Sequence, residues 1–411
     1  MADSPTAPPL SARARVPRPT VPYKPEVLAC AADAYCPTHN PDGKINLAVT
    51  TGDLLAPLWH DRLPTASVRE LVAHDPCLYN YSAHRGRTDL RAEVARFLCE
   101  AFGDAVPPTV DGSQVALFPG STAAYDVLAH CLLDAGDVIV TTRPRYAAYD
   151  FDFGARAGVS VVHVDDYDPR TLDAACDARV RAVLVCSPHN PLGTALDADA
   201  LEALSRWCAR TGRHLICSEV YAASLWAEGA ARHASSLALI SRGDHVHTVW
   251  SLSKDLGLTG MRVGALVSSN ATLHARLDSL CALCAVSQMA QVVVRDILRD
   301  RSCVTAVLAG HKTALRDAFA AVRVLLDAHA IPYTPPVGGS FVYLDLRRWL
   351  RGRSEEELWR ALFEETGVLL TPGSAQYDAE GGHFRLCFSV STLALRAALA
   401  RLDAFFLRRA S

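Results

Sequence analysis

Between residues 76 and 270, short β-branched segments alternate with amphipathic, helix-like segments, and this alternation limits the possible fold more than any other feature of the chain. It predicts an α/β layer with a mainly parallel sheet. In such a sheet the carboxyl ends of neighbouring strands share one edge, where ligands of α/β folds bind. In chain order the segments are QVALF, STAAYDVLAHCLLDA, DVIVTT, VSVVHV, RAVLVCS, DALEALSRWCARTG, HLICSEV and HVHTVWS.

The rest of the chain predicts a second, smaller layer. Helix-like and strand-like segments after residue 300 indicate an α+β domain, which part of residues 21–60 completes. A chain of 411 residues, half of them apolar, is long enough for two such domains. We expect a Pro-, Ala- and Ser-rich flexible arm at 1–20, an N-terminal segment at 21–75 that completes the small domain, a large domain at 76–270, an interdomain helix at 271–300 and a small C-terminal domain at 301–411.

Charge and apolar patterning exclude several kinds of partner. The formal charge is −3, and no block of like charges is present that would bind nucleic acid or anionic lipid. No apolar run approaches the roughly 20 residues that span a bilayer, and the N-terminus lacks the apolar stretch of a signal peptide. We therefore expect a cytoplasmic protein that binds neither nucleic acid nor membrane.

Thirteen cysteines raise the question of disulfides or a metal. The number is odd, the chain is long, and many of the cysteines lie in apolar runs, which favours buried free thiols. Cys281 and Cys284 have CxxC spacing, but no second pair follows at zinc-finger distance. Because they lie in a helix-like stretch, we expect core packing there and no metal.

Lysine is scarce, and this shortens the search for covalent chemistry. The segment SLSKDLGLTGMRVG at 251–264 places Lys254 after a strand, among glycines that permit close backbone approach. Ser251, Ser253 and Arg262 would form a site for a dianion beside this amine. A lone lysine in a Gly-rich loop is often simply solvated, but other motifs accompany this one. The four lysines are Lys24, Lys44, Lys254 and Lys312, whereas alanine and arginine are abundant, a bias that favours a bacterial source.

Two further motifs begin where predicted strands end. The segment PGST at 119–122 precedes a helix, so its backbone N–H groups and the hydroxyls of Ser121 and Thr122 suit a phosphate. The simpler interpretation is an ordinary N-cap. The segment SPHNPLGT at 187–194 forms a rigid loop that presents Asn190 at the same edge of the sheet, although NP-x-G is also a common turn.

Two more strands carry polar residues among apolar neighbours. At the exit of HLICSEVY, Ser218 and Tyr221 lie three residues apart and could face one pocket. In FRLCF, Arg385 lies among apolar residues, where an unpaired guanidinium is costly, so we expect a carboxylate partner. That partner is either a ligand or an internal Asp or Glu.

The order and spacing of these motifs resemble the fold type I enzymes of the class I/II aminotransferase family, which depend on pyridoxal 5′-phosphate (PLP). Within that family they most resemble the 1-aminocyclopropane-1-carboxylate (ACC) synthase group. The resemblance implies a seven-stranded, mainly parallel sheet in a PLP-binding large domain, and a homodimer to which residues 21–75 contribute contacts. The motifs are AYCPTHNPDGKINLA near 34, GST at 120, PRYAAYD at 144, SPHNPLGT at 187, SEVY at 218, SLSKDLGLTGMRVG at 251 and PGSAQYDAEGGHFRLCF near 372.

The resemblance also implies a role for each motif residue. Lys254 would form a Schiff base with the cofactor aldehyde and, once an amino acid has taken its place in an external aldimine, move the α-proton. Arg385 would bind the substrate carboxylate, with Asn190 nearby. Lys254, Tyr146 and Tyr221 are the predicted catalytic residues. The predicted cofactor contacts are Gly120, Ser121, Thr122, Ser251, Ser253 and Arg262 at the phosphate, Tyr146 on the pyridine ring, and Asn190 and Tyr221 at the phenolate oxygen.

Ser218 departs from the family pattern, which has an aspartate at this position. That carboxylate keeps the pyridine nitrogen protonated, and a neutral hydroxyl cannot. We expect a less protonated ring, as in the unrelated tryptophan synthase β-type fold, where a serine in this role accompanies elimination and replacement chemistry. The alternative is that water or another residue restores the contact. Glu219 is adjacent, but strand alternation points it to the other face.

Three residues bear on the substrate. Thr51 stands in a stretch where the ACC synthase pattern has glutamate and asparagine. His84 aligns with a tyrosine that reaches across the dimer, and Tyr81 is close enough to substitute for it. Simpler interpretations are a turn residue for Thr51 and a surface residue for His84. These differences weaken the specific prediction of cyclopropane formation.

Two enzymatic functions follow from the resemblance. The first is elimination or replacement of a side-chain leaving group, with S-adenosyl-L-methionine as the amino acid and, for replacement, a second co-substrate. The second is an ordinary aminotransferase that moves the amino group to a 2-oxo acid. A regulatory sensor would need a DNA-binding module, for which the short arm leaves no room. A purely binding role would not need four polar strand-end motifs.

Overall fold

The structure is a computed structural model that describes residues 21–60, 62–63, 79–102, 110–227, 230 and 233–409. The predicted arm at 1–20 and part of the segment 21–75 lie outside these residues. Within the described part of the chain, no helix is long and apolar enough to cross a bilayer. The cysteines in the same part are all free thiols.

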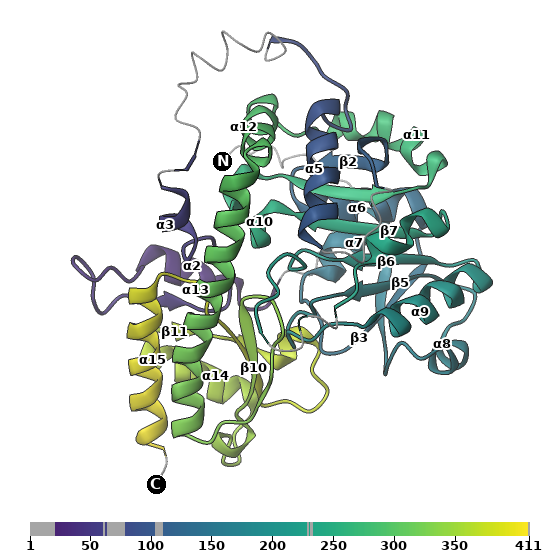
Figure 1. Ribbon diagram of the computed structural model, residues 1–411. Coiled ribbons are helices and arrows are strands. Elements are labelled where there is room, and N and C mark those ends of the chain that lie inside the picture. The colour runs from purple at the N-terminus through teal and green to yellow at the C-terminus, as the bar shows by residue number, and fades with distance from the viewer. Residues whose placement is uncertain are drawn as a thin grey trace, which may run out of the picture.

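Seven strands form one sheet in the larger part of the molecule (Figure 1). Their order is β2-β8-β7-β6-β5-β3-β4, and only β8 runs against its neighbours. The sheet is thus mainly parallel and seven-stranded, which confirms the predicted fold class. The strands are β2 (Val115–Phe118), β3 (Val138–Thr142), β4 (Ser160–Val164), β5 (Val180–Cys186), β6 (His214–Ser218), β7 (Val246–Ser251) and β8 (Gly264–Ser268).

Helices cover both faces of this sheet. On β5, Val183 and Val185 pack in one apolar core, and Ala182 and Leu184 pack in the core on the other face, because strand side chains alternate. The helices of the first core are α5 (Thr88–Ala101), α8 (Pro169–Ala175), α9 (Ala198–Thr211) and α12 (Gln288–Arg299), and those of the second are α6 (Ser121–Leu132), α7 (Tyr149–Ala157) and α11 (Ala271–Leu280).

The smaller part has its own sheets and its own apolar core. Strands in the order β12-β13-β10-β9 form an antiparallel sheet, and β1 pairs in parallel with β11. This pairing brings the N-terminal segment into the C-terminal layer. The elements are α2 (Lys24–Ala32), β1 (Ile45–Asn46), β9 (Tyr333–Thr334), β10 (Phe341–Asp345), α14 (Glu355–Thr366), β11 (Val368–Leu369), β12 (Thr371–Pro372), β13 (His383–Cys387) and α15 (Thr392–Leu407).

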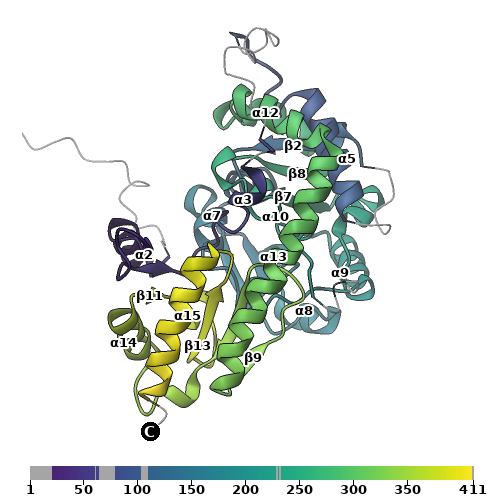
Figure 2. The same cartoon turned by 60° about the vertical axis from the view of Figure 1, so that its left-hand side comes forward.

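The helix that joins the two parts is α13 (Arg301–Ala328), which runs along both of them (Figure 2). Val304 and Val307 pack in the core of the large sheet, whereas Val322 and Leu325 pack in the core of the small part. The prediction of one long helix at 271–300 was wrong. That stretch is divided between α11 and α12, and the Asp300 side chain caps a new helix by accepting from the Cys303 N–H.

Short helical pieces complete the described secondary structure. Two of them are α-helical turns, and the others are 3₁₀ turns, which commonly serve as connectors. They are α3 (Ala56–Trp59), α10 (Leu252–Asp255), η2 (Gly112–Gln114), η4 (Ser236–Arg242), η5 (Thr259–Met261), η6 (Cys281–Leu283), η7 (Arg347–Trp349) and η8 (Gly373–Gln376).

Candidate active site

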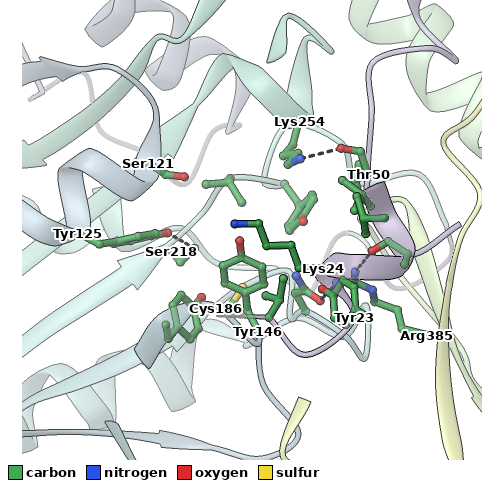
Figure 3. A pocket seen from close by; sticks show the side chains of 18 residues that line it. Tyr23, Lys24, Thr50, Ser121, Tyr125, Tyr146, Cys186, Ser218, Lys254 and Arg385 are labelled. Carbon is green, nitrogen blue, oxygen red and sulfur yellow. Dashed lines mark hydrogen bonds between the residues drawn. The ribbon is translucent and has the colours of Figure 1, made fainter. Parts of the chain in front are cut away.

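A cavity of about 240 Å³ lies at the carboxyl ends of β5 and β6, between the two parts of the molecule (Figure 3). Its walls come from α6, α7 and α10 of the larger part and from α2 and β13 of the smaller part. Motifs that are far apart in sequence therefore meet in one place. The predicted site residues that line this cavity are Ser121, Tyr146, Asn190, Ser218, Tyr221, Lys254 and Arg385.

Lys254 lies on α10, directly after β7, and its side chain enters the cavity. The Ser251 hydroxyl caps this turn by accepting from the Ser253 N–H, and the Lys254 ammonium donates to the Thr50 carbonyl over 3.0 Å. Burial lowers the pKa of Lys254 from 10.5 to about 8, and the positive charge of Arg385 acts in the same direction. About a tenth of the Lys254 amine is therefore neutral at pH 7, and this form can act as a nucleophile and a base.

The residue after the lysine fixes the turn in place. The buried Asp255 carboxylate accepts from the Ser224 hydroxyl over 2.6 Å, from the Trp250 indole over 2.8 Å and from the Ala223 N–H over 3.1 Å. These bonds point the carboxylate away from the cavity and hold α10 against the core. Asp255 thus positions Lys254 without lining the cavity.

The turn before α6 forms a cradle next to the cavity. Gly120 has φ +93°, a conformation that is strained for other residues, and a Cβ there would lie 2.2 Å from Nη2 of Arg262, so a larger residue would displace the guanidinium. The Arg262 guanidinium donates to the Pro119 carbonyl over 3.0 Å. Helix α6 has no side-chain cap, so its first backbone N–H groups remain for an anion. Arg262 thereby places a positive charge at this helix end.

The other predicted phosphate residues flank the cradle. Ser251 and Ser253 are buried, and their hydroxyls hydrogen-bond to each other over 3.0 Å. Near Thr122, the buried Asp152 on α7 has one carboxylate oxygen, Oδ2, without a hydrogen-bond partner among the described residues. Burial raises the pKa of Asp152 to about 7. Gly120, Thr122, Ser251, Ser253 and Arg262 therefore lie around the cavity without lining it.

Arg385 on β13 is 4% exposed and binds only neutral acceptors. Its Nη1 donates to the Asn190 side-chain oxygen over 2.7 Å, and its Nη2 donates to the Ala48 carbonyl and to the Thr371 hydroxyl. Its buried Nε has no partner. Among the described residues no carboxylate pairs with this guanidinium, which rules out the internal Asp or Glu there. Its charge is left to bind an anion inside the cavity.

Ser218, at the end of β6, accepts a hydrogen bond from the Tyr125 hydroxyl over 2.6 Å. Both side chains are buried. The neighbouring Glu219 lies outside the cavity wall, because its carboxylate accepts from the hydroxyls of Ser235 and Ser236. The sequence analysis missed Tyr125. Its position one helical turn after Ser121, on the same face of α6, was the signal that could have identified it.

Three predicted substrate residues do not line the cavity. The Thr51 hydroxyl donates to the Asp53 carboxylate over 2.8 Å, and the preceding Thr50 lines the cavity in its place. His84 is exposed, and its Nδ1 lies 3.2 Å from the Asp278 carbonyl oxygen. Tyr81 is 99% exposed.

Residues of the N-terminal segment also reach the cavity. Tyr23 and Lys24, at the start of α2, line it together with Thr50. Tyr23 is buried, and Lys24 adds a third positive side chain to the wall. No local motif marks these residues, because their place depends on the pairing of β1 with β11.

Comparison with known proteins agrees with this geometry. A sequence profile described as aminotransferase class I and II matches residues 44–402. The chain belongs to this family. A 1-aminocyclopropane-1-carboxylate synthase 1 from Oryza sativa subsp. indica is 31% identical over 403 residues, which cover 90% of this chain and 82% of that protein. A 1-aminocyclopropane-1-carboxylate synthase 2 from Arabidopsis thaliana is 30% identical over 91% of this chain and 80% of that protein.

Solved structures of aminotransferases share the fold. A crystal structure of an aminotransferase from Mycobacterium tuberculosis superposes with a TM-score of 0.78 at 23% identity, covering 98% of this chain and all of that one. An aspartate aminotransferase from Thermus thermophilus, solved with maleate, gives a TM-score of 0.78 at 22% identity over 97% and 99% of the two chains. At such identities the likeness concerns the fold alone.

Class I and II aminotransferases use PLP, and the cavity of this enzyme fits that cofactor. The fit rests on a desolvated amine at Lys254 and on the cradle that Gly120, Arg262 and the uncapped end of α6 form. An amine and an anion site at one cavity are what an aldehyde with a phosphate tail requires. Lys254 follows β7 and the Gly120 turn follows β2, so the amine and the anion site lie at the same edge of the sheet.

Proposed function

We propose that this enzyme binds PLP and an amino acid in the cavity and eliminates or replaces a leaving group on the amino acid's side chain. Lys254 would hold the cofactor and move the α-proton, and Arg385 would orient the substrate by its carboxylate. When bound, PLP supplies the electron sink for charge on the α-carbon. The observation that carries this proposal is a desolvated amine in the same cavity as a buried guanidinium that no described carboxylate neutralises.

The roles of the remaining cavity residues belong to the same proposal. Tyr146 would stack on the cofactor ring, and Asn190 and Tyr221 would bind its phenolate oxygen. Tyr146 and Tyr221 line the cavity, and burial raises the pKa of both phenols, so they remain neutral donors at neutral pH. Ser121 and Thr122 with Ser251, Ser253 and Arg262 would receive the phosphate.

We further propose S-adenosyl-L-methionine as the substrate. Relatives that are about 30% identical over nine-tenths of the chain and carry the name ACC synthase support this proposal. The product is then ACC, a vinylglycine-type compound, or an adduct with a second substrate. Incubation of the holoenzyme with S-adenosylmethionine should release methylthioadenosine, which chromatography with mass detection identifies, and Lys254→Ala should release none. A wild-type reaction without methylthioadenosine excludes this substrate.

Amino-group transfer to a 2-oxo acid is the second candidate function, and membership of the aminotransferase family supports it. This reaction leaves the cofactor as pyridoxamine 5′-phosphate after the amino donor has reacted. Mass spectrometry of the released cofactor, before and after addition of a 2-oxo acid, distinguishes the two functions. Accumulation of pyridoxamine phosphate that a 2-oxo acid reverses would decide for transfer.

We infer a homodimer in which Tyr81 and His84 of one subunit reach the cavity of the other. Tyr79 and Tyr81 are both exposed in the single chain, and neighbouring exposed aromatic side chains of this kind are enriched at protein interfaces, which supports this inference. Mixing Lys254→Ala subunits with Tyr81→Ala subunits should recover activity that neither variant has alone, since one site of each hybrid is intact. A mixture without recovered activity argues against shared sites.

A further inference from the structure

Neutral hydroxyl and thiol groups form the cavity wall that lies across from Lys254 (Figure 3). Tyr125 donates to Ser218 over 2.6 Å, and Tyr149 and Cys186 line the same wall. Ser218 is 2% exposed and Tyr125 is 3% exposed. Burial raises the pKa values of Tyr125 and Cys186, so this wall carries no charge at neutral pH.

None of the 18 residues that line the cavity is Asp or Glu, whereas Lys24, Lys254 and Arg385 carry positive charge there. Three buried carboxylates lie on neighbouring elements, and none of them lines the cavity. Glu219 accepts from the Ser235 and Ser236 hydroxyls and Asp255 accepts from Ser224 and Trp250, whereas Oδ2 of Asp152 has no hydrogen-bond partner among the described residues.

A further positive charge at the Ser218 wall would be unfavourable for two reasons. It would be desolvated, because Ser218 and Tyr125 are buried, and it would meet other cations without a counter-charge. A neutral acceptor is different. The Ser218 oxygen accepts a hydrogen bond from the Tyr125 hydroxyl, so the Ser218 O–H group can donate to a lone pair. The wall therefore suits a ligand nitrogen that accepts a hydrogen bond.

We propose that Tyr125 and Ser218 meet the ring nitrogen of PLP as a neutral hydroxyl pair and hold that nitrogen unprotonated. This inference rests on the proposed function, because it assumes that PLP occupies the cavity with its aldehyde at Lys254. The ring nitrogen of PLP is para to the aldehyde carbon, so attachment at Lys254 directs it to the opposite wall. An unprotonated ring withdraws less charge from the α-carbon, which favours loss of a side-chain leaving group over amino-group transfer.

The test is ¹⁵N NMR of the holoenzyme, reconstituted with PLP labelled in the ring and measured without substrate. Wild-type protein should show the shift of a neutral, hydrogen-bonded pyridine nitrogen. Ser218→Asp should move it to the pyridinium range, because the new carboxylate stabilises a proton on the ring. Ser218→Ala is the matched control, which removes the hydroxyl without adding charge and should keep the neutral range. If Ser218→Asp does not fold, the wild-type shift alone decides.

Tyr125→Phe tests the second member of the pair. Without the hydrogen bond from Tyr125, the Ser218 hydroxyl can turn away from the ring. The ¹⁵N shift of the ring nitrogen should then move towards that of a free neutral pyridine. An unchanged shift in this variant removes Tyr125 from the proposal. A pyridinium shift in the wild type overturns the proposal as a whole, and its loss in Asp152→Asn would identify Asp152 as the source of the charge. Failure of PLP to attach to Lys254 would instead overturn the proposed function.

Discussion

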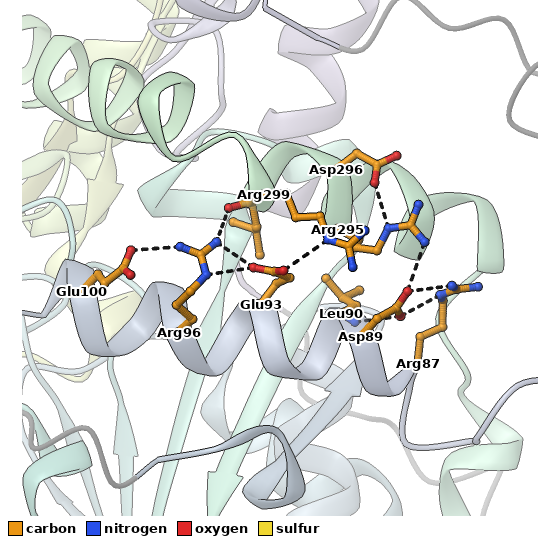
Figure 4. Close-up of polar contacts among 10 residues, drawn as sticks. Arg87, Asp89, Leu90, Glu93, Arg96, Glu100, Arg295, Asp296 and Arg299 are labelled. Carbon is orange, nitrogen blue, oxygen red and sulfur yellow. Dashed lines mark hydrogen bonds and ion pairs between the residues drawn. The ribbon is translucent and has the colours of Figure 1, made fainter. Parts of the chain in front are cut away.

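Positive side chains meet different surroundings at the α5–α12 interface and in the cavity. Between α5 and α12, arginines alternate with carboxylates (Figure 4). Within α5, Arg96 lies 2.7 Å from Glu93 and 3.0 Å from Glu100; across the two helices, Arg295 lies 3.1 Å from Asp89 and Arg299 lies 3.2 Å from Glu93. The pairs are partly exposed, so each contributes little to stability.

In the cavity the same kinds of side chain pair with no carboxylate from the described part of the chain. Lys254 donates to a backbone carbonyl, and Arg385 binds neutral oxygens. Buried charge without a partner costs stability, so a fold retains it where a ligand supplies the missing anion. The comparison supports a structural role for the interface and the proposal that the cavity binds a phosphate and a carboxylate.

Loss of the cavity amine should have the largest effect. Lys254→Ala removes the nucleophile and the base, so activity should fall by about 10²- to 10⁴-fold or more, and the visible absorbance of attached cofactor should disappear. Lys44→Ala is the matched control, because Lys44 pairs with Asp33 away from the cavity. An active Lys254→Ala variant, or loss of absorbance in Lys44→Ala, would contradict the assignment.

Substitution of Arg385, the guanidinium of the cavity, should have the second-largest effect. Arg385→Lys keeps the charge but cannot bind a carboxylate through two parallel hydrogen bonds, so KM for the amino acid should rise by roughly 30-fold, or about 2 kcal/mol. The same substitution at Arg96, within the α5–α12 interface, is the control and should leave KM unchanged. Equal effects of the two variants on KM would erase the distinction between the regions.

The rate of cofactor attachment should change by about one order of magnitude with pH. Only the neutral Lys254 amine attacks an aldehyde, and burial lowers its pKa to about 8. The neutral fraction grows as pH rises, so stopped-flow mixing of apoprotein with PLP should show a rate about tenfold lower at pH 7 than on the plateau above about pH 9. A rate that keeps rising to pH 10 would mean that the amine is solvated.

The sequence predicted the large sheet because its signals are local. Short β-branched segments alternate with amphipathic helical segments along the chain, and in the structure β5 packs its side chains into a core on each face of the sheet. The error at 271–300 arose where local signals are weak. The stretch Leu283–Ser287 is short and partly apolar, and only the Asp300 cap reveals that the long helix begins afterwards.

The cavity was predictable to the extent that its residues sit at strand ends. Lys254, Asn190 and Ser218 follow strands and therefore share one edge of the sheet. Residues from the N-terminal segment could not be predicted, because they reach the cavity only through long-range packing. Thr50 lines the wall and Thr51 does not, since the hydroxyl of Thr51 is held by Asp53 in a turn.

The smallest expected effect lies at the α5–α12 interface. Glu93 accepts from Arg96 over 2.7 Å and from Arg299 over 3.2 Å, so Glu93→Gln removes the charge that both arginines share. Because these pairs are partly exposed, the free energy of unfolding should fall by only about 1 kcal/mol, and added salt should shrink the difference. Urea unfolding of the wild type and the variant at low and high salt measures this difference in the free energy of unfolding. The KM of the variant should equal that of the wild type. A loss several times larger, or one that salt does not reduce, would mean that this interface holds buried charge as the cavity does.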